Sequence, residues 1–327
     1  MNVKNKTVYV GLSGGVDSAV SAALLKEQGA SVVGVFIKGW YPPGMPCTWS
    51  AERRDAMRVA AHLRIPFRTL DASAEYKKEV IDYLISEYRT GRTPNPDVMC
   101  NKEVKFGAFY RYAMSEGADA IATGHYRSGE KDQTYFLWAV PKEVLASTVF
   151  PVGYMKKDDV RRLAKKFGIP VSDKKDSQGV CFLGSVSVDE FLKSEFEVQK
   201  GPCVDENGTM VGSHDGAQLY TLGERVSLSG GPWFVTAKNL DTNTLVVSHT
   251  IKRMVGDAHH VSFAGANWHG ESSLVNGAQY RYRGKLTRGR VERSVFIAQE
   301  PLLETPASGQ SLVFYEDNEL IGGAVIA

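Results

Sequence analysis

The chain has 327 residues, of which 43% are hydrophobic, and a formal net charge of +2 at pH 7. This length and composition predict a substantial core divided among two or three domains. The longest apolar stretches fall far short of the ~20 residues that a membrane helix needs, and no apolar signal region follows residues 1–6. The sequence therefore predicts a cytoplasmic protein without a membrane partner.

Strands and helices alternate along the first part of the chain. Short β-branched runs predict strands at residues 6–12, 30–37, 66–70 and 118–124, and helical periodicity predicts helices at residues 18–29, 52–65, 74–91 and 102–117. This alternation predicts an α/β domain whose right-handed crossovers build a parallel sheet with helices on both faces. Ligands bind such sheets outside the carboxyl ends of the strands, where the turn Gly11–Ser18 would lie.

After about Lys200 the pattern changes to short, glycine-rich and aromatic β-like segments. Such strands predict a small barrel or sandwich of about eighty residues, with a last hairpin that turns at Glu316–Asn318. Pro202–Val235 is less regular and is expected to be an adaptor. The predicted domains are residues 1–200 for the α/β domain, residues 201–243 for the adaptor and residues 244–327 for the β-barrel.

The turn Gly11–Ser18, "GLSGGVDS", connects the first predicted strand to the first predicted helix. A helix N-terminus offers backbone N–H groups and the positive end of the helix dipole, which favour a phosphate, and glycine lets the backbone approach it closely. The turn has Asp17 and no lysine. Because an acid beside a phosphate requires a cation, we infer that Mg²⁺ bridges Asp17 and a nucleotide. From composition alone, a glycine-rich turn chosen only for its geometry is the alternative.

The cysteines Cys47, Cys100, Cys181 and Cys203 lie far apart and form no Cys-x-x-Cys pair. Their spacing indicates neither a zinc finger nor a disulfide framework. Each is then an inert core residue or a working thiol.

Ser13-Gly14-Gly15-Val16-Asp17-Ser18 resembles the pyrophosphate loop of the ATP pyrophosphatase (PP-loop) superfamily. Members of this superfamily cleave ATP to AMP and pyrophosphate and adenylate a substrate oxygen. Seven later blocks, in order along nearly the whole chain, are similar to signature blocks of the tRNA-specific 2-thiouridylases. These blocks are Thr93–Phe106, Ala122–Tyr126, Lys131–Leu137, Lys174–Gly184, Tyr220–Val235, Tyr280–Gly284 and Gly309–Ile326.

This resemblance implies an adenine nucleotide alpha hydrolase-like domain, an adaptor and a barrel. It also implies ATP-dependent thiolation of the wobble uridine of tRNA anticodons at C2. The implied nucleotide-binding residues are Gly11, Leu12, Ser13, Gly14, Gly15, Val16, Asp17, Ser18, Ile37 and Gly124. Within Gly223–Gly231, Glu224, Val226 and Ser227 depart from the family's pattern, which bears on how tRNA is positioned and chosen.

The resemblance implies that Cys181 carries the transferable sulfur as a persulfide and that Cys100 attacks its inner bond, which leaves a disulfide between them. The two Cα atoms must then approach within ~7 Å. Asp97 is implied as general acid/base for uracil N3 and O2, although a turn-capping carboxylate after Pro96 is also common. We assign no role to Cys47 or Cys203.

The implied tRNA contacts lie in several of these blocks. They are Asn95, Pro96, Asp97, His125, Lys131, Asp132, Gln133, Arg281, Tyr282 and Gln310. An arginine beside an aromatic residue suits a phosphate contact with base or ribose stacking, whereas a cross-strand surface pair is the plainer interpretation. A lone histidine is more often structural. The basic runs Lys156–Lys175 and Arg281–Arg293 are solvated faces or contacts for a polyanion.

The expected partners are tRNA and a sulfur-donor protein such as a cysteine desulfurase or a sulfur relay protein. Two other functions compete. Another adenylating synthetase of the PP-loop superfamily needs no pair of thiols, so full product formation by a Cys181→Ala protein would favour it. A non-catalytic, nucleotide-dependent RNA-binding protein would bind RNA without cleaving ATP to AMP and pyrophosphate.

Overall fold

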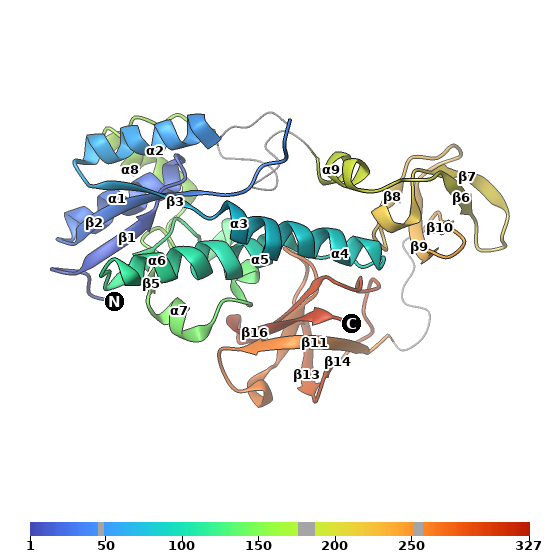
Figure 1. Ribbon diagram of the computed structural model, residues 1–327. Coiled ribbons are helices and arrows are strands. Elements are labelled where there is room, and N and C mark those ends of the chain that lie inside the picture. The colour runs from blue at the N-terminus through green and yellow to red at the C-terminus, as the bar shows by residue number, and fades with distance from the viewer. Residues whose placement is uncertain (45–48, 176–186, 251–257) are drawn as a thin grey trace. The chain divides into compact units, whose positions relative to one another are not determined.

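The computed structural model describes residues 1–44, 49–175, 187–250 and 258–327 (Figure 1). They form two compact units. The first unit joins Met1–Val80 with Asp97–Val186, and the second joins Ile81–Pro96 with Ser187–Ala327. Within the described ranges, no helix has the length and apolar character needed to cross a membrane.

A five-stranded parallel sheet forms the centre of the first unit. Its spatial order is β3-β2-β1-β4-β5, and every neighbouring pair is parallel. The strands are β1 (Thr7–Gly11), β2 (Ser31–Lys38), β3 (Phe67–Asp71), β4 (Ala120–Ala122) and β5 (Thr148–Val149). The four predicted strands and the α/β fold are confirmed. The fifth strand has two residues, too few to produce a recognisable sequence pattern.

Helices cover both faces of this sheet, as predicted. On one face, Val8 and Val10 share a core with apolar residues of α1, α2 and α8. On the other face, the rings of Tyr9 and of Tyr112 in α6 make a T-shaped contact, with centroids 6.4 Å apart. Successive strand residues point to opposite faces. Because helices cover both faces, every residue of the run Val8-Tyr9-Val10 is in a packed interior, and the run is apolar throughout. The helices named here are α1 (Val16–Glu27), α2 (Trp49–Leu63), α8 (Lys157–Lys166) and α6 (Phe109–Ser115), and the short α7 spans Lys142–Ala146.

Two predicted helices contain π-helical segments. The first runs as α3 (Ser73–Tyr76), η1 (Lys77–Asp82) and α4 (Tyr83–Arg89), and the second as α5 (Pro96–Met99), η2 (Cys100–Ala108) and α6. A π-helix is rare and often occurs at functional sites. A periodicity of 3.6 residues does not predict it, so the sequence pattern indicated plain α-helices here.

In the second unit, helix α9 (Val188–Glu195) precedes a five-stranded sheet of order β7-β6-β10-β9-β8. Its strands are β6 (Gly201–Val204), β7 (Met210–His214), β8 (Arg225–Val226), β9 (Trp233–Asn239) and β10 (Thr244–Ser248). The sequence boundary at residue 244 places β10 in the barrel, and this placement is wrong. Strand β10 pairs antiparallel with the preceding strand β9 and in parallel with β6. The pairing with β6 is non-local, so local sequence pattern does not reveal it.

The rest of the second unit is a closed barrel of order β11-β14-β13-β12-β15-β16. Its strands are β11 (His260–Trp268), β12 (Gly277–Gln279), β13 (Thr287–Glu292), β14 (Val295–Ala298), β15 (Ser311–Glu316) and β16 (Glu319–Ile326). Phe263 and Phe296 pack on Phe314 inside it. The predicted last hairpin is confirmed: Glu316 pairs with Glu319, and both residues between them have positive φ, as a two-residue type I′ turn requires.

Candidate active site

The turn between β1 and α1 is shaped by glycine. Gly14 has φ +76°, and a Cβ atom there would lie 2.4 Å from the carbonyl oxygen of Glu52, so no other residue fits. Gly15 is the N-cap of α1 and has no side chain that could cap the helix. The N–H groups of the first helical turn therefore face the turn without an intrahelical acceptor, which is the arrangement that binds phosphates.

The two serines hold this turn in shape. Buried Ser18 accepts a hydrogen bond from the Ser13 backbone N–H through Oγ (3.2 Å) and donates one to the Gly15 carbonyl (3.2 Å). Ser13 Oγ accepts from the Gly15 N–H (3.3 Å). These contacts fix the backbone before any ligand arrives.

Gly124 lies against this turn, just beyond β4. A Cβ atom on Gly124 would lie 2.8 Å from the Ser18 nitrogen and 3.1 Å from the Asp17 Cβ. Ile37 of β2 also comes near, because its Cδ1 would lie 3.9 Å from a Cβ atom on Gly11. The predicted nucleotide residues from three strands thus meet at the carboxyl edge of the sheet, where the chain order reverses around β1.

Two lysines that are distant in sequence supply the cations that the turn lacks. Lys157 Nζ, at the start of α8, lies 2.7 and 2.8 Å from the two carboxylate oxygens of Asp17. Lys174 Nζ donates to the Gly14 carbonyl (3.1 Å) and contacts Asp55 of α2 (2.8 Å). Both belong to the basic run Lys156–Lys175, so the signal was visible, but nothing local assigned these two residues to the turn.

Tyr126 is a third residue that sequence reasoning missed. Its hydroxyl donates to Asp17 Oδ1 (2.8 Å), and its ring lies beneath the Lys157 ammonium, 5.8 Å from ring centroid to Nζ. Tyr126 thus helps to orient the carboxylate. It directly follows Gly124 and His125, which the sequence did single out.

The surroundings of Asp17 bear on Mg²⁺. The carboxylate keeps 29% of its side-chain surface exposed, and one carboxylate with substrate phosphates and water is a donor set that Mg²⁺ accepts. Among the described residues, no group of three or more His, Cys, Asp or Glu side chains is placed to hold a metal. Asp17 can therefore contribute one ligand to an ion that arrives with its phosphates.

Asp97 and Cys100 stand on one helical run. They are three residues apart across α5 and the start of η2, so they lie on neighbouring turns of the same side. Burial raises the pKa of Asp97, and the nearby Lys105 ammonium lowers it less. Cys100 is a thiol with 3% of its surface exposed. Cys181, its predicted partner, and Cys47 lie outside the described residues. Cys203 is a buried thiol in the core of the second sheet.

His125 sits among aromatic rings. Its ring centroid lies 5.4 Å from that of Phe106 and 6.4 Å from that of Phe150, and Nδ1 lies 2.9 Å from Thr123 Oγ1. Burial lowers its pKa to about 3, and the Lys105 charge lowers it further. The imidazole is therefore neutral at pH 7 and does not act there as a cation for phosphate.

Lys131 is the last residue of the 3₁₀ turn η3 (Gly129–Lys131), and Asp132 and Gln133 connect it to the 3₁₀ turn η4 (Thr134–Leu137). Asp132 accepts hydrogen bonds from the backbone N–H and hydroxyl of Thr134 (2.8 and 2.7 Å). Gln133 Oε1 accepts from the Tyr126 N–H (3.0 Å). Of these three predicted tRNA contacts, Gln133 therefore also holds the backbone that carries Tyr126, and Asp132 holds the start of η4.

Asn95 and Pro96 end the segment Ile81–Pro96 of the second unit. This segment is anchored just before them, at Thr93. The Thr93 N–H donates to the Ser308 carbonyl (2.9 Å), and Gln310 Nε2 donates to the Thr93 carbonyl (2.8 Å). The predicted tRNA contact Gln310 thus positions the chain that leads into Asn95.

Arg281 and Tyr282 follow β12 at the barrel. Arg281 pairs with Glu304 (2.5 Å), and its Nη2 would lie 2.9 Å from a Cβ atom on Gly223. The guanidinium of Arg283 lies 5.1 Å from the Tyr282 ring centroid. Arg281, Asn95 and Gln310 therefore occur in one unit, with segments from the adaptor sheet and the barrel.

Comparison with known proteins adds the family. The model for the tRNA methyl transferase HUP domain matches residues 6–130 and 127–185. The model for the tRNA methyl transferase PRC-barrel domain matches residues 189–249, which include β10. Among solved structures, NMN synthetase from Francisella tularensis is 20% identical over 53% of this chain and 67% of that chain, with a TM-score of 0.40. At this TM-score the likeness carries no weight for fold or function.

Two curated relatives are much more similar, and both are named tRNA-specific 2-thiouridylase MnmA. The protein of Enterococcus faecalis (strain ATCC 700802 / V583) is 40% identical over 98% of this chain and 94% of the relative. The protein of Francisella tularensis subsp. holarctica (strain FTNF002-00 / FTA) is 40% identical over 99% of this chain and 100% of the relative. The chain therefore belongs to the family of tRNA-specific 2-thiouridylases.

Proposed function

We propose that this chain is an ATP-dependent tRNA-uridine 2-sulfurtransferase that makes 2-thiouridine at the wobble position of anticodons. The observation that carries the proposal is the 40% identity, over nearly the whole chain, to relatives named as 2-thiouridylases. The shape of the turn Gly11–Ser18 supports the ATP-dependent half of the reaction.

The nucleotide would bind with its phosphates at the N-terminus of α1. Gly14 lets the turn lie against α2, Gly15 leaves the N-cap of α1 without a side chain, and Gly124 lets the end of β4 approach the Ser18 backbone. Lys157 and Lys174 would neutralise phosphate charge, and Ile37 would lie near the adenine. Asp17 would hold Mg²⁺, which supplies further positive charge at the phosphates when bound.

Adenylation turns the C2 oxygen of uracil into a leaving group. The uracil O2 attacks the α-phosphorus of ATP and pyrophosphate leaves, while N3 loses its proton. Asp97 would take that proton. Because burial raises its pKa, its carboxylate is a stronger base than an exposed one, and a larger share of the group is protonated near neutral pH and available as an acid.

Sulfur transfer would then use two thiols. The outer sulfur of a persulfide on Cys181 attacks C2 and AMP leaves. The Cys100 thiolate next attacks the Cys181 sulfur, which breaks the inner S–S bond, leaves sulfur on C2 and forms the Cys100–Cys181 disulfide. A sulfur-donor protein would load the persulfide, and a reductant of the thiol class would reopen the disulfide.

The two matching family models are described as tRNA methyl transferase domains. The experiment must therefore distinguish thiolation of the tRNA from methylation. Purified protein would be incubated with unmodified tRNA, Mg²⁺-ATP and sulfide or a persulfide donor, and the digested nucleosides weighed by mass spectrometry. We expect 2-thiouridine, with AMP and pyrophosphate in equal amounts. Methylated uridine, formed only when a methyl donor replaces the sulfur source, would overturn the proposal.

A further inference from the structure

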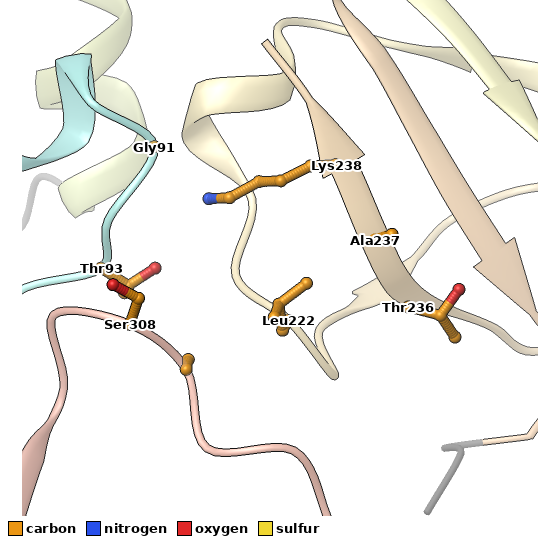
Figure 2. A pocket seen from close by; sticks show the side chains of 8 residues that line it. Gly91, Thr93, Leu222, Thr236, Ala237, Lys238 and Ser308 are labelled. Carbon is orange, nitrogen blue, oxygen red and sulfur yellow. The ribbon is translucent and has the colours of Figure 1, made fainter. Parts of the chain in front are cut away.

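The second unit holds a pocket of about 260 Å³ whose walls come from three parts of the chain (Figure 2). Gly91 and Thr93 belong to the segment after α4, Leu222 and Lys238 to the adaptor sheet and its loop, and Ser308 to the loop before β15. All of these residues lie in the same compact unit.

Lys238 provides the pocket's charge. Figure 2 shows its side chain leaving strand β9 and extending toward Gly91 and Thr93. Its Nζ donates to the Tyr220 carbonyl (2.6 Å). Among the described residues, no carboxylate lies within ion-pair distance of this ammonium, and the pocket lining contains no acid.

Hydroxyl groups face the same space, and the remaining walls are apolar. Thr93 Oγ1 donates a hydrogen bond to Thr221 Oγ1 (3.1 Å), so its proton is already used and its oxygen can only accept a further bond. Ser308 uses its carbonyl, and not its hydroxyl, to hold Thr93. The Lys238 ammonium and the Ser308 hydroxyl are donors for a phosphate, and the side chains of Leu222, Ala237 and Ala307 suit the sugar attached to it.

The neighbours of the pocket point to RNA as the source of that phosphate. Asn95 follows Thr93 by two residues, and Gln310 is hydrogen-bonded to the Thr93 carbonyl. Arg281 lies against Gly223, the residue after Leu222. Three residues predicted to contact tRNA thus border the pocket from three segments.

We propose that this pocket receives one backbone phosphate of the substrate tRNA, held by the Lys238 ammonium with the Ser308 hydroxyl. The inference rests on the proposed function and adds a binding site to it. Phosphate contacts of this kind position a nucleic acid without reading its sequence, so the pocket would set the register of the RNA relative to Asn95 and Pro96.

The titration of Lys238 gives this site a signature. Burial lowers its pKa to about 8, against a smaller opposing effect of Glu224. The other titratable groups around it are Glu224, Asp189, Tyr88 and Tyr220. Burial raises the pKa values of both tyrosines above 10.0, so neither ionises between about pH 7 and about pH 8.8. Burial also raises the pKa of Glu224, and the Lys238→Met variant, which keeps Glu224, separates ionisation of that carboxyl from ionisation of the lysine. A bound phosphate favours the charged amine, so affinity should fall as pH rises through about 8.

The first test measures tRNA affinity without ATP at about pH 7 and about pH 8.8, in wild type, Lys238→Met, Lys238→Arg and the exposed control Lys200→Met. We expect wild type to weaken several-fold at the higher pH, because ordinary lysines titrate near pH 10.4. Lys238→Met should bind about tenfold more weakly at pH 7 and show no such pH dependence. Lys238→Arg should keep its affinity at both pH values, and Lys200→Met should follow wild type.

The second test identifies the source of the phosphate. Lys238 would be modified with trace acetic anhydride at about pH 8, where an amine of lowered pKa reacts readily, and quantified by peptide mass spectrometry. tRNA should protect it, whereas AMP, pyrophosphate or inorganic phosphate should not. Protection by the small anions alone would overturn the RNA assignment. Ser308→Ala, a milder change in the pocket, should weaken tRNA binding less than Lys238→Met.

These tests need no catalysis, so the two proposals fail separately. If wild type binds and thiolates tRNA while Lys238→Met and Lys238→Arg behave like it at both pH values, the pocket assignment is wrong and the proposed function stands. If wild type binds no tRNA, both are wrong. Thermal unfolding of each variant shows whether a lost affinity reflects a lost fold.

Discussion

Two lysines in the two units are held in opposite ways. Lys157 meets both oxygens of the Asp17 carboxylate, whereas Lys238 meets a neutral carbonyl and its pKa is lowered to about 8 by burial. The side chain of Lys157 is only 14% exposed, so burial alone does not distinguish them. The difference is whether an anion of the protein itself accompanies the cation.

This difference predicts different responses to a ligand phosphate. At the first site the phosphate must compete with Asp17 for Lys157, so binding rearranges an existing pair. At the second site the phosphate would supply the anion that Lys238 lacks, so binding completes a pair. RNA affinity should accordingly fall as pH rises through about 8, where Lys238 loses its charge.

Asp97→Asn should have the largest effect and should separate chemistry from both binding sites. We expect thiolation to fall by about 10²–10⁴-fold, as for loss of a general acid/base, while ATP and tRNA still bind. The same substitution should make the folded protein more stable, although it lowers the activity. Burial raises the pKa of this carboxyl in the folded protein above its value in the unfolded chain. The group then leaves the free energy of unfolding unchanged at pH values below the unfolded pKa, and it destabilises the folded state at pH values above the folded pKa.

The Asn variant should therefore unfold at a higher temperature than wild type at pH 7, and this gain should vanish in acid. Thermal melts across pH and nucleoside analysis check the two parts. An unchanged thiolation rate would remove Asp97 from the chemistry, and an unchanged melting temperature at pH 7 would contradict its burial.

Gly124→Ala should impair the reaction with ATP and leave tRNA binding unchanged. Its methyl group would lie 2.8 Å from the Ser18 nitrogen and push the β4 loop away from α1, and displacements of this size cost about 10²-fold in rate. Pyrophosphate release measures the loss. Gly270→Ala is the matched control, because its methyl group meets Ile321 at an ordinary 3.5 Å. Loss of tRNA affinity in Gly124→Ala would contradict the separation of the two sites.

Lys157→Met tests the paired lysine directly. It leaves Asp17 with the Tyr126 hydroxyl and removes a charged hydrogen-bond donor worth roughly 1.5–3 kcal/mol, or about 10- to 100-fold in ATP affinity. Equilibrium binding of ATP measures this. Lys165→Met, on the same helix but 69% exposed beside Asp173, should bind ATP like wild type. If the two variants bind ATP equally well, the Asp17–Lys157 pair has no part in the site.

Gln310→Leu should have the smallest effect. It removes the hydrogen bond to the Thr93 carbonyl, which contributes about 1 kcal/mol, and loosens one wall of the second site. The KM for tRNA should rise a few-fold while the KM for ATP stays constant. Gln299→Leu, at an exposed position of the barrel, should change neither. A rise in the ATP KM would show that the sites are coupled.

Local sequence patterns predicted those parts of the fold that depend on residues close together in the chain. The β1–α1 turn follows from its glycines, and the last hairpin follows from Asp317 and Asn318, which adopt positive φ. Lys157 and Lys174 could not be assigned this way, because they reach the turn from 140 and 160 residues away. The placement of β10 failed for the same reason, since its parallel partner β6 is not its neighbour in sequence.

The segment Ile81–Pro96 is synthesised early, but its packing partners are synthesised near the end of the chain. Arg92 donates to the Ile326 carbonyl, 234 residues further along, and Thr93 pairs with Ser308. At about 5–20 residues per second, a ribosome takes on the order of ten seconds or more to supply those partners. A nascent chain must therefore keep this stretch from misassembling in the meantime, and a fragment that ends before β6 would expose it permanently, which makes such a fragment a poor substitute for the whole enzyme.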